Sequence, residues 1–253
     1  MSVNYREVPN QFPEDAVRYA DGIGQMNKLA EGLFKDGKLP ERFRSSANTG
    51  VEAVSPEDLL RQQMYELLGR AVNPTEEEKR ELGEKMGLVF LPIVRKSYLE
   101  LVTANPRHYL SDEGEYANAR PELRDYRPPV AVEVGFKKAE LVLPDSLLKS
   151  RYEALQMIRK YSQQLTGDFP AFQAIGLPVT GYAAADEEYA RRNPGQALFK
   201  REFAWGLDNL PGGRAAAAGR AAPGKQFRVR DWHPRSGDGR IGGAPAVVKI
   251  GTK

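Results

Sequence analysis

Hydrophobic residues recur three or four positions apart in much of the first 210 residues, which predicts amphipathic helices. The clearest case begins at Ser55, whose hydroxyl can cap a helix with Pro56 in its first position. Another helix is expected from Thr75, which three glutamates follow. The stretches predicted to be helical are 13–34, 55–69, from 75 onward, 88–104, 146–165, 169–176, 184–192 and 195–207.

The helix at 55–69 should bury one face, because its apolar residues return at helical spacing. The residues expected on that face are Leu60, Met64, Leu67 and Leu68.

Alternating apolar and polar residues are rarer and predict few strands. Residues 130–143 are the best candidate, as a strand or as a hairpin turning near 135–138. Short strands are also expected at 227–232 and 245–250. The predicted fold is therefore mainly α with a small β element (α+β), with loops at 35–53 and 105–129.

Charge divides the chain unevenly. Residues 211–253 contain nine Lys or Arg and two Asp, a net charge of +7; because the whole chain carries +3, residues 1–210 carry −4. Nine glycines and few apolar residues in this segment predict an extended, flexible basic arm. The expected organisation is an N-terminal helix and loop (1–53), a helical body (54–210) and a C-terminal arm (211–253).

Basic and aromatic residues alternate in the predicted arm, which makes it the candidate partner-binding region. This pattern suits an arm that docks on an acidic protein surface, with Trp232 as its anchor. It also suits phosphate contacts combined with stacking on nucleic-acid bases. The candidate partner-binding residues are Arg214, Arg220, Lys225, Phe227, Arg228, Arg230, Trp232, Arg235 and Arg240.

Composition narrows the chemistry that the chain can carry. The absence of cysteine excludes disulfides, thiolate metal sites and cysteine nucleophiles, and two histidines are too few for a histidine-rich metal site. No signal peptide or stretch long enough to span a membrane is expected. We therefore expect a soluble protein without a catalytic, metal or cofactor site.

Three motif matches are better explained as structure than as chemistry. Residues 219–226 resemble a phosphate-binding loop but lack its Ser/Thr, and residues 237–242 match G-x-G-x-x-G without the helix that should follow. Ser146 and Lys149 match S-x-x-K, but a serine at this position is expected to cap a helix.

His108 is the remaining candidate for acid–base chemistry, because Asp112, Glu113 and Glu115 follow it closely. The alternative is a surface histidine in a polar loop. The acidic run 186–188 is interpreted as the solvated first turn of a helix.

One short element has a known counterpart. Residues 65–70, followed by Asn73-Pro74-Thr75 and Glu78, resemble a Y-x-L-L-G-R…P-T-x-x-E helix-turn-helix element of phage virion structural proteins and, more loosely, of phycobilisome linkers. The resemblance covers about fifteen residues of 253 and implies assembly rather than catalysis.

We expect a non-enzymatic structural component of a large multi-subunit complex, most concretely a capsid-, portal- or tail-associated phage protein. The alternatives are an accessory protein that binds nucleic acid through its basic tail, and a hydrolase or transferase with a site around His108.

Overall fold

The structure is a computed structural model, and it describes residues 54–251. The chain divides into two compact units, Met1–Pro56 and Glu57–Lys253, and the described helices and strands lie in the second, apart from Pro56 itself. The predicted helix at 13–34 and the predicted loop at 35–53 lie outside the described residues.

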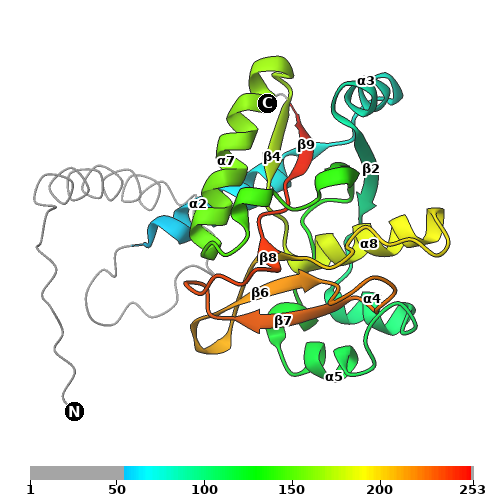
Figure 1. Cartoon of the computed structure of the whole chain (residues 1–253), viewed down its shortest axis with the longest axis vertical. Helices are drawn as coiled ribbons and strands as arrows, with labels where there is room; N and C mark the ends of the chain where they lie inside the picture. The colour runs from blue at the N-terminus through cyan, green and yellow to red at the C-terminus, as the bar shows by residue number, and fades with distance from the viewer. Residues whose placement is uncertain (1–53, 252–253) are drawn as a thin grey trace, which may run out of the picture. The chain divides into compact units, whose positions relative to one another are not determined.

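Two β-sheets, of five and four strands, form the framework of the second unit (Figure 1). The prediction of a mainly helical fold with one small β element was therefore wrong: the architecture is α/β.

The five-stranded sheet is built around the last strand of the chain. Val247 of β9 pairs with Gly135 on one side and with Ala174 on the other, so β9 is an interior strand. The strands are β1 (Ala71–Val72), β2 (Leu88–Ile93), β3 (Val132–Lys137), β4 (Phe172–Ile175) and β9 (Ala246–Ile250). All of their pairings are antiparallel.

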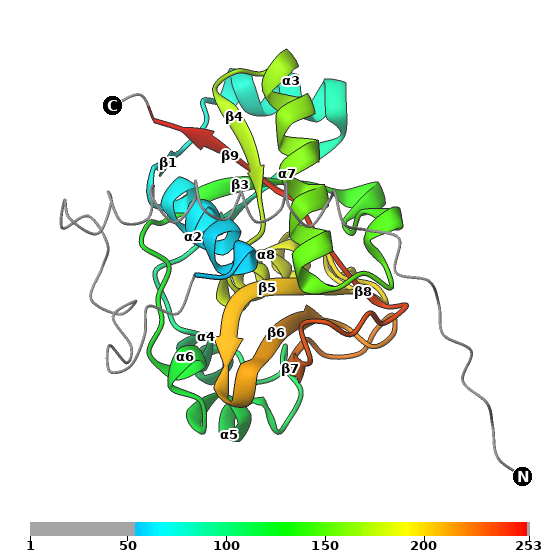
Figure 2. The ribbon, with the colours of Figure 1, turned by 90° about the vertical axis from the view of Figure 1, so that its left-hand side faces the viewer.

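The four-stranded sheet has the order β7-β6-β5-β8 and is visible in Figure 2. Strands β5, β6 and β7 form an antiparallel meander, and β8 pairs parallel to β5. Its strands are β5 (Phe203–Leu210), β6 (Arg214–Gly219), β7 (Arg228–Trp232) and β8 (Ile241–Gly242).

Helices pack on both sheets. Helix α8 contacts β2 of the larger sheet as well as β5 and β6 of the smaller one, and α7 packs on β4. The helices are α2 (Pro56–Gly69), α3 (Glu76–Met86), α4 (Tyr98–Ala104), α5 (Glu113–Asn118), α6 (Pro121–Arg124), α7 (Arg151–Asp168) and α8 (Val179–Arg192), with 3-10 turns η2 (Lys138–Glu140), η3 (Pro144–Ser146) and η4 (Pro211–Gly213).

Local helix signals located α2 and α3 correctly. Leu60, Met64 and Leu68 are buried as predicted, whereas Leu67 is half-buried at the edge of that face. Thr75 caps α3 through a capping box with Glu78. The segment that resembles the virion element covers the end of α2, the strand β1 and the start of α3.

Several predicted helices are strands or begin elsewhere. Residues 88–104 form β2 followed by α4, and the stretches 169–176 and 195–207 contribute β4 and the start of β5. These strands are buried on both faces, which removes the period-two pattern that distinguishes a strand from a helix. Of the two interpretations of residues 130–143, the strand is correct for Val132–Lys137 (β3), which runs through Gly135 without a hairpin turn. The predicted loop at 105–129 contains α5 and α6.

Helix α7 begins at Arg151 and not at Ser146, because Ser150 and Glu153 form its capping box. The intervening residues follow the turn η3 as a short irregular segment.

The basic C-terminal segment is folded, so the prediction of an extended arm was wrong. It contributes β6, β7, β8 and β9 to the two sheets, and the short strands predicted at 227–232 and 245–250 are present as β7 and β9. The alanine run at 215–218 is fully buried in β6, where small side chains allow aromatic residues of the neighbouring strands to pack closely. Backbone pairing therefore orders a segment whose composition resembles that of a linker.

No helix among the described residues is long and apolar enough to cross a membrane.

Candidate functional site: the basic face of the four-stranded sheet

The structure separates the predicted partner-binding residues into internal and surface groups. Phe227 is fully buried, and Arg220 is almost fully buried beside Asp186. Arg214 pairs with Asp231 on the neighbouring strand. Phe227 and Arg220 are internal and are not available to a partner, whereas the side chain of Arg214 is 41% exposed and joins β6 to β7. Lys225 is exposed at the turn between β6 and β7.

Asp186 is the centre of the first buried polar cluster. Its Oδ2 accepts hydrogen bonds from Arg220 Nη2 at 2.6 Å and Nε at 3.1 Å, and it lies 3.0 Å from His108 Nε2. Its Oδ1 accepts from the backbone N–H groups of Leu198 and Phe199 at 2.9 and 3.0 Å. Burial alone would raise the pKa of Asp186, but these partners, His108 and Arg220 foremost, outweigh burial and lower it.

The Asp186 cluster corrects the interpretation of the acidic run as a solvated turn. Asp186 is fully buried, Glu187 accepts a hydrogen bond from Tyr109 Oη at 2.8 Å, and Glu188 pairs with two arginines of its own helix. His108 likewise does not lie in a polar surface loop: its ring packs against Tyr109 and Phe227.

This arrangement offers little for acid–base catalysis. Within residues 54–251, His108 makes no hydrogen bond to a serine or threonine hydroxyl that it could activate, and the carboxylate of Asp186 is saturated by its donors. Two of the three carboxylates expected to work with His108 are engaged elsewhere: Glu113 accepts hydrogen bonds from Tyr98 and Val229, and Asp112 pairs with Arg230.

Glu113 is the centre of a second buried cluster, which reaches the surface. It accepts from Tyr98 Oη at 2.6 Å and from the backbone N–H of Val229 at 2.9 Å, and it forms an ion pair with Arg230. Burial nevertheless dominates and raises the pKa of Glu113. The cluster fixes β7 to helix α5 and fixes Arg230 at the surface of the smaller sheet.

Arg228, Arg230 and Trp232 alternate along β7 and so share one face of the four-stranded sheet, which, together with the loop that follows β7, we call the basic face. We define it as Arg228, Arg230 and Trp232 of β7, Arg235 and Arg240 of the loop 233–240, and Leu148, which lies beside that loop. Trp232 is half-buried with its ring centroid 6.4 Å from that of Phe203. Arg235 and Arg240 are exposed, and Arg240 pairs with Asp238 at 3.4 Å.

Leu148 is the residue of the basic face that sequence reasoning missed. Its side chain is 69% exposed, the most exposed large hydrophobic residue in the described part of the chain, and its backbone has φ 64°. Its N–H donates to Asp238 O at 3.2 Å, and Gly237 packs so closely on its carbonyl that a Cβ there would collide with it. The loop 233–240 therefore holds an apolar residue in a strained left-handed conformation at the surface.

The three motif matches are structural in this fold. Residues 219–226 form the connection between β6 and β7, and residues 237–242 lead into β8 without a following helix. Ser146 is buried and does not cap α7: its Oγ accepts from the N–H of Gly243 at 2.8 Å and donates to Leu143 O at 2.5 Å.

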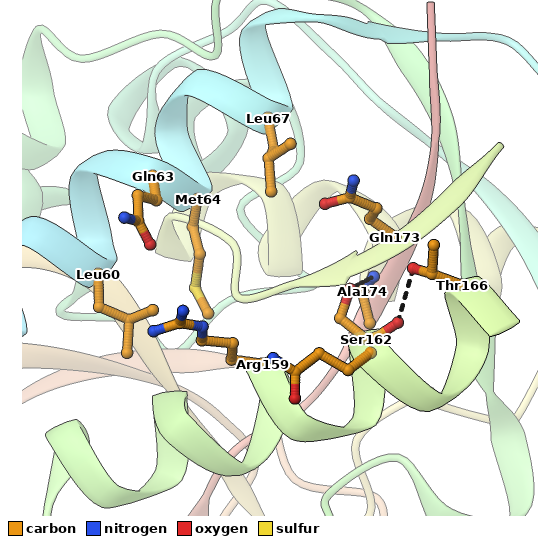
Figure 3. Close-up of a pocket in the computed structure, with 10 residues that line it drawn as sticks. Leu60, Gln63, Met64, Leu67, Arg159, Ser162, Thr166, Gln173 and Ala174 are labelled. Carbon is orange, nitrogen blue, oxygen red and sulfur yellow. Dashed lines mark hydrogen bonds between the residues drawn. The ribbon is translucent and has the colours of Figure 1, made fainter. Parts of the chain in front are cut away.

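A pocket of about 380 Å³ lies between α2, α7 and β4 (Figure 3). Its floor is apolar, with Leu60 and Met64, and Arg159 and three glutamines line it with them. Ser162 and Thr166 are already engaged with the backbone of β4, through Ala174 N at 2.9 Å and Phe172 O at 3.2 Å. At this pocket, Ser162 and Thr166 already hydrogen-bond to the backbone of β4, and the remaining polar side chains are largely exposed. Among the lining residues there is no buried charge that a ligand would need to neutralise.

No group of three or more His, Asp or Glu residues within 54–251 is arranged to hold a metal ion. Comparisons of the chain with protein-family models, with curated protein sequences and with solved structures gave no match. The function is therefore inferred from the geometry of the basic face.

Proposed function

We propose that this protein is a non-catalytic component of a multi-subunit assembly and docks an acidic protein partner on the basic face. Leu148 is the observation that carries the proposal. A left-handed leucine costs about 1–2 kcal/mol, and a side chain that is 69% exposed contributes little burial in return. Burial of this side chain in an apolar socket on another protein would offset the cost of the strained backbone.

The surroundings of Leu148 fit the anatomy of a protein interface. An exposed leucine and a half-buried tryptophan lie among arginines, which matches the apolar core and polar rim of such surfaces. Arginine and tryptophan are also the side chains that most often dominate binding energy. The resemblance of residues 65–78 to a virion element supports a phage particle as the setting of this assembly.

Affinity purification of the tagged full-length protein from its native source tests the proposal. The wild type should retain a protein partner after nuclease treatment, and Leu148→Asn should lose it, since asparagine tolerates the left-handed backbone but removes the apolar group. Lys160→Ala on α7, which removes an exposed charge away from the basic face, is the matched control and should retain the partner.

Two results would contradict the proposal. Equal recovery of the partner by Leu148→Asn and the wild type would remove the basic face from the interaction. Recovery of nucleic acid alone, lost after nuclease treatment, would assign the basic face to the nucleic-acid alternative.

A further inference from the structure

Arg228 lies across the four-stranded sheet instead of projecting away from it. In the pairing register, Arg228 of β7 is opposite Gly219 of β6, which is opposite Phe203 of β5, so the three share one row and one face. Gly219 has no side chain to obstruct the row, and the guanidinium carbon of Arg228 lies 5.4 Å from the centroid of the Phe203 ring. A Cβ at position 219 would collide with the carbonyl of Glu202, so the fold requires glycine there and leaves the space between Arg228 and Phe203 free of a side chain.

The charge of Arg228 is compensated only at a distance, by carboxylates that form ion pairs with another arginine. Its half-buried guanidinium makes no ion pair with a carboxylate of residues 54–251, and its Nε is buried without a hydrogen-bond acceptor. The nearby carboxylates serve other arginines: Asp112 and Glu113 pair with Arg230, and Asp238 pairs with Arg240. Burial, and then the repulsion from Arg230 and Arg240, lower the pKa of Arg228.

A second buried donor on the same face also lacks an acceptor. Trp205 is fully buried, and within the described chain its Nε1 has no hydrogen-bond partner. Its register partner Ala217 is opposite Arg230, so Trp205 lies in the row next to that of Arg228. The great majority of buried donors in proteins are satisfied. Trp205 is too deeply buried for an outside acceptor to reach, so the half-buried Arg228 is the residue of this face that a partner can pair with.

We infer that Arg228, with Arg230 and Arg240 beside it, forms an oxyanion subsite that receives a carboxylate of the acidic partner. A carboxylate accepts two parallel hydrogen bonds from one guanidinium, so it would supply Arg228 with the ion pair that it lacks among residues 54–251. The inference rests on the proposed docking function and adds the chemical group that the partner must present.

The surroundings favour a carboxylate of a protein over a nucleic-acid phosphate. Sequence-tolerant binding of single strands uses aromatic faces on which bases stack. Trp232 is half-buried against Phe203, and Phe203 is itself buried beneath Arg228. The large hydrophobic side chain that is exposed on the basic face is Leu148, which is aliphatic. It suits an apolar socket rather than stacking on a base.

Intrinsic fluorescence reports on this subsite directly, because the chain has two tryptophans and both lie in this sheet. The full-length protein is titrated at low salt with a hexaglutamate peptide and, separately, with a six-nucleotide oligothymidylate. The wild type should show a saturable change with hexaglutamate. Arg228→Gln should weaken that binding at least about tenfold, as expected when one charge-assisted pair is lost.

Arg80→Gln removes the same charge from the exposed surface of α3 and is the matched control, which should bind hexaglutamate as the wild type does. Thermal melting provides a second readout. Without peptide, Arg228→Gln should melt at the same or a higher temperature than the wild type, because a repelled, unpaired guanidinium is removed. Hexaglutamate should raise the melting temperature of the wild type and not that of Arg228→Gln.

Three results would overturn the inference: no saturable change in the wild type, equal weakening by Arg80→Gln, or tighter binding of oligothymidylate than of hexaglutamate. None of them depends on the native partner. If the subsite fails here while Leu148→Asn still abolishes recovery of the partner, the docking function stands and only the assignment of Arg228 falls.

Discussion

Two residues affect the stability of the fold in opposite directions: Leu148 lowers it and Asp186 raises it. A single substitution at each position can measure the effect. Leu148 has a left-handed backbone and an exposed side chain, so it reduces the stability of the isolated protein. Asp186 is buried but fully hydrogen-bonded to His108, Arg220 and two backbone N–H groups. The first residue should be replaceable without loss of folding, and the second should not.

Leu148→Gly should leave the free energy of unfolding unchanged or raise it by up to about 1 kcal/mol, because the relief of backbone strain offsets the flexibility of glycine in the unfolded chain. The adjacent Leu147 is the matched control, since it packs on the core with φ −63°. Leu147→Gly should therefore be clearly destabilising. Urea denaturation of both variants measures the difference, and a Leu148→Gly loss as large as that of Leu147→Gly would contradict the account.

Asp186→Asn should cost about 3–5 kcal/mol at neutral pH, because Arg220 is left buried without its counter-charge. The pKa of Asp186 is lowered in the folded state, so the contribution of its charge is fully present above the ordinary carboxyl pKa of about 3.9. That contribution is lost as the pH falls through the lower, folded-state pKa. The difference in the free energy of unfolding between Asp186→Asn and the wild type should therefore become smaller in acid.

Exposed Asp145 provides the control, and Asp145→Asn should change stability by no more than about 0.5 kcal/mol. Unfolding followed at neutral and acid pH tests the effect. A neutral-pH stability of Asp186→Asn equal to that of the wild type would mean that the buried cluster is not formed.

At the scale of elements, local signals in the sequence predicted the helices better than the strands. The capping box of Thr75 and Glu78 and the apolar face of α2 depend on neighbours in the chain, so the sequence shows them directly. Strands β4 and β5 depend on partners far away in sequence and are buried on both faces, which made them resemble helices. Strand β6 also depends on distant partners, and its run of alanines beside glycines resembled the sequence of a linker.

The central strand β9 illustrates how strongly the C-terminal segment is integrated. Val247→Ala should destabilise the protein by about 2 kcal/mol, because Val247 is 1% exposed and pairs with strands on both sides. Val72→Ala in β1 makes the same change at a position that is 40% exposed, and it should cost no more than about 0.5 kcal/mol. Equal melting temperatures for the two variants would show that β9 is not an interior strand.

At the scale of the whole molecule, the sequence assigned the wrong physical state to the basic C-terminal segment, which is folded. The excess of arginine in residues 211–253 directed attention to Arg228, Arg230 and Trp232, which alternate along β7, and to Arg235 and Arg240 of the loop that follows. It could not show that Arg220 is buried beside Asp186, since that contact joins residues 34 positions apart. It gave no indication of Leu148, whose exposure depends on the loop 233–240 packing on its backbone.

The central claim is that the basic C-terminal segment is a folded docking surface. Hydrogen–deuterium exchange of the full-length protein, alone and with hexaglutamate, tests this most directly. In the free protein, the amides of β6, β7 and β9 should exchange as slowly as those of α7, and the peptide should slow exchange further at residues 228–232 and 237–240. Exchange of residues 211–251 at the rate of an unstructured chain in the free protein, with protection only after the peptide is added, would contradict the account and restore the flexible arm.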